Sequence, residues 1–148
     1  MSGSTHRLAT KLGHAGELRP RVLGAVVMPV FMSSTYEYGG EESYHDLRYL
    51  RLSNTPNHTV LHAKLAALEN AEDALVTASG MAAISATLLA LLRPGDHVLA
   101  LDQLYGGTFE LVTRDLPGLG IACDLIGPDD PRDWARRLRP ETRMIYVE

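Results

Sequence analysis

Ser79, Gly80 and Met81 stand where a short apolar segment, Leu75–Ala78, gives way to a long apolar helical segment. The first amides of a helix have no intrahelical acceptor, and a serine before them is a typical N-cap. A helix N-terminus also carries about half a positive charge, which favours an anion such as phosphate. An N-cap on a tight turn is the commoner meaning of Ser-Gly before a helix. The phosphate hypothesis therefore needs support from other residues.

Tyr105 and Gly106 form a second corner of the same kind, after the predicted strand His97–Leu101. Ligands of parallel α/β sheets gather at the carboxyl ends of the strands. Because a predicted strand precedes each corner, we expect the Ser79 and Tyr105 corners to meet at one edge of a sheet.

Two histidines, His58 and His62, have the four-residue spacing of metal ligands on one helix face. The glutamate that completes a zinc-protease helix is missing, so we interpret them as helix-surface histidines and predict no metal site.

Strands and helices alternate around the two corners. The predicted strands are 73–78, 97–101, 121–126 and 144–147. The first predicted helix begins at His58 and has Leu61, Leu65 and Leu68 along one face. The other predicted helices are 80–92, one that ends near 116, and 131–138. This alternation indicates βαβ crossovers and a parallel sheet covered on both faces, hence an α/β fold. We expect helix 80–92 to be buried on most sides. The chain stops at Glu148, immediately after the last predicted strand, so we expect the sheet to be unfinished; a complete small domain ending in an edge strand is the alternative.

Residues 1–56 show little periodicity and frequent glycine and proline. Long irregular segments are uncommon within a compact domain, so we predict an N-terminal arm that lies on a second subunit. Within it, Ala25–Phe31 is predicted to be a buried extended segment. Residues 57–148 form the sheet domain in this interpretation.

Composition excludes several function classes. The 148 residues carry a formal net charge of -4, which does not attract nucleic acid or an anionic membrane. The longest apolar run, Met81–Leu92, falls short of the ~20 residues that span a bilayer, and the start of the chain lacks the apolar core of a secretion signal. The single cysteine, Cys123, is typical of a reducing compartment. We therefore expect a cytoplasmic protein.

Several short motifs occur in an order that resembles one enzyme family. They are His14-Ala15-Gly16, Ser33-Ser34-Thr35-Tyr36, Tyr49-Leu50-Arg51 with Asn54 and Pro56, Leu65-Ala66-Ala67-Leu68-Glu69, Ser79-Gly80-Met81-Ala82-Ala83, Gly95-Asp96, Tyr105-Gly106-Gly107-Thr108 and Ile145-Tyr146-Val147-Glu148. From Thr10 to Glu148 the chain resembles the N-terminal part of the cysteine and methionine metabolism enzymes that depend on pyridoxal 5'-phosphate (PLP). That family includes cystathionine γ-synthase, cystathionine lyases, methionine γ-lyase and O-acetylhomoserine sulfhydrylases.

The resemblance implies a fold and a cofactor site. The fold is an N-terminal arm plus the first part of a three-layer α/β/α, aspartate aminotransferase-like (fold type I) large domain. Ser79, Gly80 and Met81 would bind the PLP phosphate, and Tyr105 would stack on the pyridine ring and assist proton transfer. Tyr49 and Arg51 would reach the phosphate from a neighbouring subunit, since arginine forms two parallel charged hydrogen bonds.

The implied activity is transsulfuration: elimination at the β or γ carbon, or γ-replacement, on a small sulfur amino acid such as cystathionine or on a homoserine ester. The implied assembly is a homo-oligomer, a dimer of dimers.

The chain also departs from the family pattern. Asn54-Thr55-Pro56-Asn57 carries one extra residue, which puts the local loop in doubt, and Gly107 stands where methionine γ-lyases typically have cysteine, which disfavours that activity. The family's PLP-binding lysine and the aspartate that pairs with the pyridine nitrogen would lie beyond Glu148, itself a match to a family acid near the cofactor. The two lysines present, Lys11 and Lys64, are not in the family's lysine context. We therefore predict that this chain alone has no turnover.

Two further functions are compatible with the sequence. One is a non-catalytic remnant or interaction module that pairs with a polypeptide bearing the lysine. The other is a nucleotide-binding Rossmann domain, which is disfavoured because Gly118-Leu119-Gly120 follows a helix and lacks a third glycine.

Overall fold

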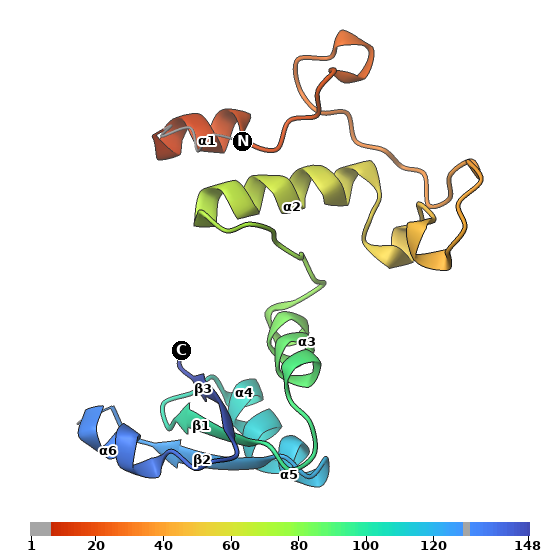
Figure 1. Ribbon diagram of the computed structural model, residues 1–148. Helices are drawn as coiled ribbons and strands as arrows, with labels where there is room; N and C mark the ends of the chain where they lie inside the picture. Colours follow the sequence, from red (N-terminus) through yellow and green to blue (C-terminus); the bar gives the residue numbers. More distant parts are fainter. Residues whose placement is uncertain (1–6, 129–130) are drawn as a thin grey trace. The chain divides into compact units, whose positions relative to one another are not determined.

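The computed structural model describes residues 7–128 and 131–148 of the chain (Figure 1). They fall into two compact units, Met1–Val76 and Thr77–Glu148. Within the described ranges, no helix is both long and apolar enough to cross a membrane.

The first unit is built on two α-helices, α1 (Leu8–His14) and α2 (Pro56–Glu69). Three short 3-10 turns, Val22–Gly24, Tyr44–Asp46 and Leu50–Leu52, interrupt the irregular chain between them. Proline is favoured at the first position of a helix, so α2 begins at Pro56, two residues before the predicted start. It ends at Asn70 in the left-handed conformation, a common helix stop.

The two lysines of the chain join α1 to α2, which lie against each other (Figure 1). Lys11 Nζ donates to the carbonyl oxygen of Ala67, 2.9 Å away, near the end of α2. Lys64 Nζ donates to the carbonyl oxygen of Leu12, 3.0 Å away, in the last turn of α1. Terminal carbonyls of a helix lack intrahelical donors and favour positive charge. Each helix is therefore capped by the lysine of the other.

Gly16 allows the chain to cross α2 closely. Its φ is 76°, and a Cβ placed there would lie 2.6 Å from both Lys64 N and Val60 O. Only glycine accommodates this backbone conformation and approach without a shift.

The second unit contains a three-stranded parallel sheet and its helices. In chain order the elements are α3 (Gly80–Leu91), β1 (His97–Leu101), α4 (Gly106–Glu110), a π-helical turn (Leu111–Asp115), α5 (Leu116–Gly118), β2 (Ala122–Ile126), α6 (Pro131–Arg137) and β3 (Thr142–Tyr146). The strand order is β2-β1-β3, with His97 beside Ala122 on one side and Thr142 on the other. The predicted α/β class and three of the four predicted strands are confirmed.

The core of this unit lies on one face of β1. Val98 and Ala100 point to that face and pack with Leu88 of α3, Val112 and Leu116. Leu99, which points to the opposite face, is also fully buried. A central strand buried on both faces is typical of parallel sheets.

Two predictions about α3 and its approach are wrong. Residues 73–78 form no strand, and Leu75 is 67% exposed. A strand needs a neighbouring strand to accept its backbone hydrogen bonds, and no strand in the described ranges pairs with this segment. Helix α3 itself has Leu88 as its one buried residue, while Leu89 and Leu91 are exposed. The described residues of the second unit therefore cover only part of the apolar surface of α3.

The arm also differs from expectation. Ala25–Phe31 is irregular rather than a strand, and Val26 and Val27 are exposed, so its predicted burial is wrong. A short run of residues cannot bury its apolar side chains without a surface to pack against. Helix α1 was not predicted, because its seven residues are too few to show a periodic pattern.

Candidate functional site

The Ser79 corner has the geometry of a helix N-terminus. Ser79 is the N-cap of α3, and its hydroxyl oxygen accepts a hydrogen bond from Ala82 N at 3.1 Å. The first backbone bond of the helix joins Ala83 N to Ser79 O, so the amides of Gly80 and Met81 precede it and have no helical acceptor. A Cβ at Gly80 would meet no atom within 4 Å. Gly80 is therefore open to solvent on its Cα side, and the two amides lack helical acceptors.

The Tyr105 corner follows β1 and begins α4. Tyr105 is the N-cap of α4, and its carbonyl oxygen accepts the first helical bond, from Phe109 N at 2.9 Å. Its side chain is 67% exposed. An exposed aromatic ring at the carboxyl end of a strand can stack on a flat ligand.

Gly107 is where the two corners meet. A Cβ at Gly107 would lie 2.8 Å from Met81 Sδ and 2.9 Å from Tyr105 Cε1, closer than such atoms pack. The side chain of Met81 and the ring of Tyr105 therefore both lie over Gly107. The structure brings the two corners together as expected, although no strand leads into the first.

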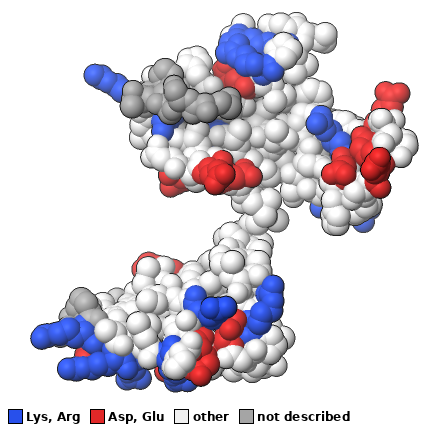
Figure 2. All heavy atoms as spheres, viewed as in Figure 1, with Lys and Arg blue, Asp and Glu red and all other residues white. Residues whose placement is uncertain are grey.

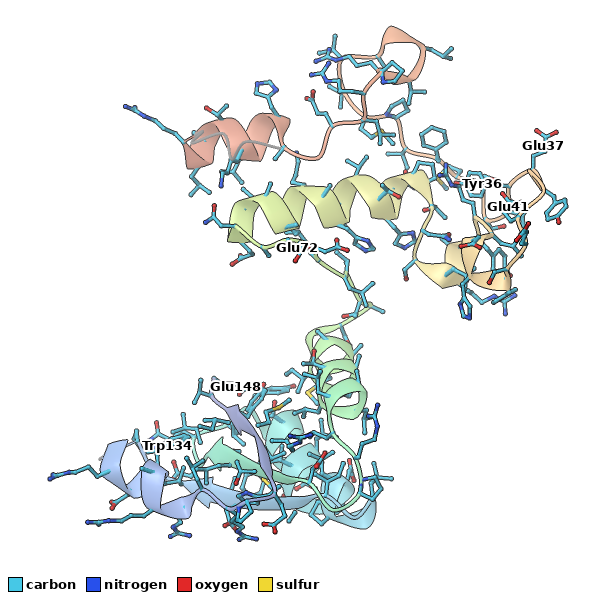
Figure 3. All side chains as sticks on the ribbon, viewed as in Figure 1. Tyr36, Glu37, Glu41, Glu72, Trp134 and Glu148 are labelled. Carbon is cyan, nitrogen blue, oxygen red and sulfur yellow. The ribbon has the colours of Figure 1, made fainter. Side chains whose placement is uncertain are left out.

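Glu148 lies just beyond β3 and accepts three hydrogen bonds (Figure 3). Its Oε2 accepts from Tyr105 N at 2.7 Å, and its Oε1 accepts from Thr108 Oγ1 at 2.6 Å and from the hydroxyl of Tyr146 at 2.8 Å. The Thr108 hydroxyl, followed by the Tyr105 amide and the Tyr146 hydroxyl, lowers the pKa of Glu148. Burial, and then the bond to Glu148, raises the pKa of Tyr146. The local sequence carries no signal for the contacts of Glu148 with Tyr105 and Thr108, because these partners are 43 and 40 positions away.

Tyr49 and Arg51 form a pair within the first unit. Arg51 Nε donates to the Tyr49 hydroxyl at 2.8 Å, Arg51 Nη2 donates to the same oxygen, and the guanidinium lies 5.0 Å from the ring centroid. The pKa of Arg51 is raised, and the hydrogen bond to the Tyr49 hydroxyl is the largest cause. Asn54 fixes this loop: its Oδ1 accepts from Tyr49 N at 2.9 Å, and its Nδ2 donates to Leu47 O at 2.6 Å.

The extra residue of the Asn54–Asn57 segment takes a defined place. Thr55 is the N-cap position of α2, is 1% exposed, and its hydroxyl lies 2.8 Å from His58 Nδ1. The rings of His58 and His62 lie with their centroids 6.0 Å apart and are tilted by 44° to each other. In residues 7–128 and 131–148, no group of three potential metal ligands includes them.

The charged surface of the second unit is mixed. On the face drawn in Figure 2, arginines gather near α6 and acidic side chains lie among them. Arg136 pairs with Asp133 at 3.1 Å, and Arg139 pairs with Asp124. Lysine does not occur in the sequence of this unit, because both lysines of the chain precede Thr77.

Comparison with known proteins decides the family. Residues 9–148 match the Cys/Met metabolism PLP-dependent enzymes. The chain belongs to this family. The resemblance drawn from the ordered motifs is confirmed, and the cofactor of the family is PLP.

Relatives within the family are lyases and synthases. The chain is 41% identical over 140 residues to a probable cystathionine gamma-synthase of Herpetosiphon aurantiacus, covering 95% of this chain and 43% of the relative. It is 38% identical over 148 residues to cystathionine beta-lyase MetC of Bacillus subtilis, covering 100% of this chain and 37% of the relative. It therefore spans less than half the length of these relatives.

Solved structures agree on the fold. The crystal structure of metB from Corynebacterium glutamicum matches with a TM-score of 0.88 and 25% identity, covering 99% of this chain and 38% of that one. A cystathionine gamma-lyase from Lactobacillus plantarum, complexed with L-serine, matches with a TM-score of 0.84 and 28% identity over 96% of this chain and 36% of that one. The chain thus has the fold of the N-terminal part of this family.

Proposed function

We propose that this chain supplies the phosphate cup and the ring-stacking tyrosine of a PLP site. The observation that carries the proposal is that the Met81 side chain and the exposed ring of Tyr105 both lie over Gly107, while the amides of Gly80 and Met81 have no helical acceptor. Membership of a PLP-dependent family supplies the ligand.

The two corners have different roles in this site. The Ser79 hydroxyl and the amides of Gly80 and Met81 bind the phosphate, where the positive end of α3 favours a dianion. Tyr105 orients the ring of the cofactor by stacking and excludes water from one of its faces. When bound, PLP stores the electron pair released when a bond at the α-carbon of an amino acid breaks. In this proposal the Tyr105 hydroxyl assists proton transfer at that carbon.

Tyr49 and Arg51 act on the phosphate of a neighbouring subunit in this proposal. The Tyr49 hydroxyl presets the Arg51 guanidinium, which remains charged at any physiological pH. A preset, planar donor loses less entropy when it binds an anion. The proposed assembly is a homo-oligomer, a dimer of dimers, in the cytoplasm.

The activity that we propose for this site is β- or γ-elimination, or γ-replacement, on a small sulfur amino acid. This chain alone is proposed to have no turnover. Its two lysines cap helices in the first unit, and the unit that carries the phosphate cup contains none. In this proposal neither Lys11 nor Lys64 serves as the amine that bonds the cofactor or takes the substrate proton.

Replacing Gly80 with proline tests the phosphate cup. Proline removes the first helical amide but is well tolerated at that position, and Ser79 before it already has the extended conformation that proline requires (φ -162°, ψ 162°). We expect Gly80→Pro to keep the thermal stability of the chain and to raise the Kd for PLP about tenfold, as expected for one charge-assisted hydrogen bond. Absorbance titration with PLP measures the Kd.

The matched control is Leu8→Pro, which removes the first amide of α1 and should leave the Kd unchanged. Pyridoxal, which lacks the phosphate, should bind weakly to the parent chain, and its Kd should be the same for the parent and both variants. Equal PLP affinity in Gly80→Pro and the parent would reject the cup. Borohydride reduction that fixed PLP on Lys11 or Lys64, together with turnover of a sulfur amino acid, would reject the inactivity of the chain.

A non-catalytic module that pairs with a lysine-bearing polypeptide is the second candidate. The exposed apolar residues of α3, Leu89 and Leu91, favour it because they are available for a partner. Mixing this chain with the C-terminal remainder of a relative tests it. Stable co-purification without any turnover supports the module, whereas turnover in the mixture supports the enzyme.

A further inference from the structure

Glu148 gathers donors from two segments that flank the proposed cofactor site. The Tyr105 amide opens α4, the Thr108 hydroxyl lies in the first turn of that helix, and the Tyr146 hydroxyl ends β3. The three distances, 2.7, 2.6 and 2.8 Å, are those of good hydrogen bonds. One carboxylate therefore joins the end of β3 to the start of α4.

The chemistry of the cluster requires a carboxylate. All three partners are donors, and an ionised carboxylate is the side chain that accepts on both oxygens and donates on neither. A glutamine of the same shape has one acceptor oxygen and no charge, so it cannot accept from the Tyr105 amide on one side and from the two hydroxyls on the other. Thr108 is fully buried, so its hydroxyl has little access to water as an alternative partner.

The bond to the Tyr105 amide fixes the backbone from which the exposed ring projects. Because that ring and the side chain of Met81 lie together over Gly107, a shift at the Tyr105 amide also changes the spacing between ring and phosphate cup. A negative charge at the start of α4 is further favoured by the helix dipole.

We propose that Glu148 is a positioning residue: its ionised carboxylate holds the Tyr105 corner in place through the Tyr105 amide and the Thr108 and Tyr146 hydroxyls. The expected effect of Glu148 on PLP affinity rests on the proposed function. Its expected effect on the position of the Tyr105 amide does not.

Glu148→Gln tests the proposal in the full chain, with Asp96→Asn as its matched control. Asp96 also caps a backbone amide with its carboxylate, accepting from Arg93 N at 2.7 Å, but it lies at the other end of β1. We expect Glu148→Gln to move the NMR resonance of the Tyr105 amide upfield and to speed its hydrogen exchange about tenfold, and to raise the Kd for PLP by a similar factor. Asp96→Asn should leave these three quantities unchanged.

Tyr146→Phe is the second variant, because it removes one donor and keeps the carboxylate. It should shift the Tyr105 amide resonance less than Glu148→Gln does. If Glu148→Gln does not fold, the test becomes whether Tyr146→Phe shifts this resonance at all. An unchanged Tyr105 amide in the folded variants, or an equal change in Asp96→Asn, would overturn the proposal. If the parent chain binds no PLP, the proposed function fails while the amide measurements still decide the role of Glu148.

Discussion

Glu148 has an environment that sets its charge. Three donors favour its ionised form and lower its pKa below the usual 4.5. A carboxylate with a lowered pKa in the folded state stabilises the fold above its unfolded pKa, and this contribution is lost as the pH falls through the folded pKa. The stabilisation should therefore be present at neutral pH and disappear below about pH 4.5.

The corresponding measurement compares the parent chain with Glu148→Gln in urea. At pH 7 the parent should have the higher midpoint, and the gap should close as the pH is lowered well below 4.5, since glutamine does not titrate. A gap of constant size between pH 7 and pH 3 would contradict a role for the ionised carboxylate.

Gly107 and Gly106 offer a matched pair of substitutions. Alanine favours a helix over glycine by up to about 1 kcal/mol, so Gly106→Ala, whose Cβ meets nothing within 4 Å, should raise the free energy of unfolding. Gly107→Ala should gain less or lose stability, because its Cβ would press on Met81 Sδ and Tyr105 Cε1. Urea denaturation of both variants measures the difference. Equal gains would mean that the ring and the thioether do not lie over Gly107.

Cys123 is expected to be an unreactive thiol. Burial, and then the charge of Asp124, raises its pKa to about 11, so little thiolate is present at pH 8. Alkylation by iodoacetamide at pH 8 should be slow in the folded chain and fast in urea. Similar rates in the two conditions would contradict this environment.

Helices α1 and α2 depend on each other through the two lysine caps. Lys11→Met or Lys64→Met removes a charged donor from the last carbonyls of the opposite helix, and each should cost about 1 kcal/mol of stability. Hydrogen exchange of the α1 amides measures the effect, with Arg7→Met, at the other end of α1, as the control. Exchange that is unchanged in both lysine variants would show that the caps contribute nothing.

The assembly of the protein decides whether Arg51 acts on its own or a neighbouring site. A chain with Arg51→Gln keeps its phosphate cup, and a chain with Gly80→Pro keeps its arm. If the arm acts on a partner, mixing the two after dissociation should restore about one quarter of the tight PLP sites, because half of the random dimers are mixed and each has one intact site. PLP titration before and after mixing measures this, and no gain on mixing would contradict the proposed cross-subunit role of Arg51.

Local patterns in the sequence determined many of the elements. Pro56 and Asn70 bound α2 through conformations that these residues favour by themselves, and β1 matches its predicted residues, His97–Leu101. Ser79 as the N-cap of α3 also follows from the residue alone. The motif order then predicted the family, which the comparisons confirm.

The tertiary structure decided what depends on a partner distant in sequence. Residues 73–78 have a strand-like composition but pair with no strand in residues 7–128 and 131–148, and the second unit covers only part of the apolar surface of α3. The cluster around Glu148 and the contact of Met81 and Tyr105 over Gly107 join residues that no periodicity links. A cap or a turn is stabilised by atoms a few residues away, whereas burial and cross-chain hydrogen bonds exist only once the chain has folded; the sequence therefore places the corners, and folding determines which side chains meet there.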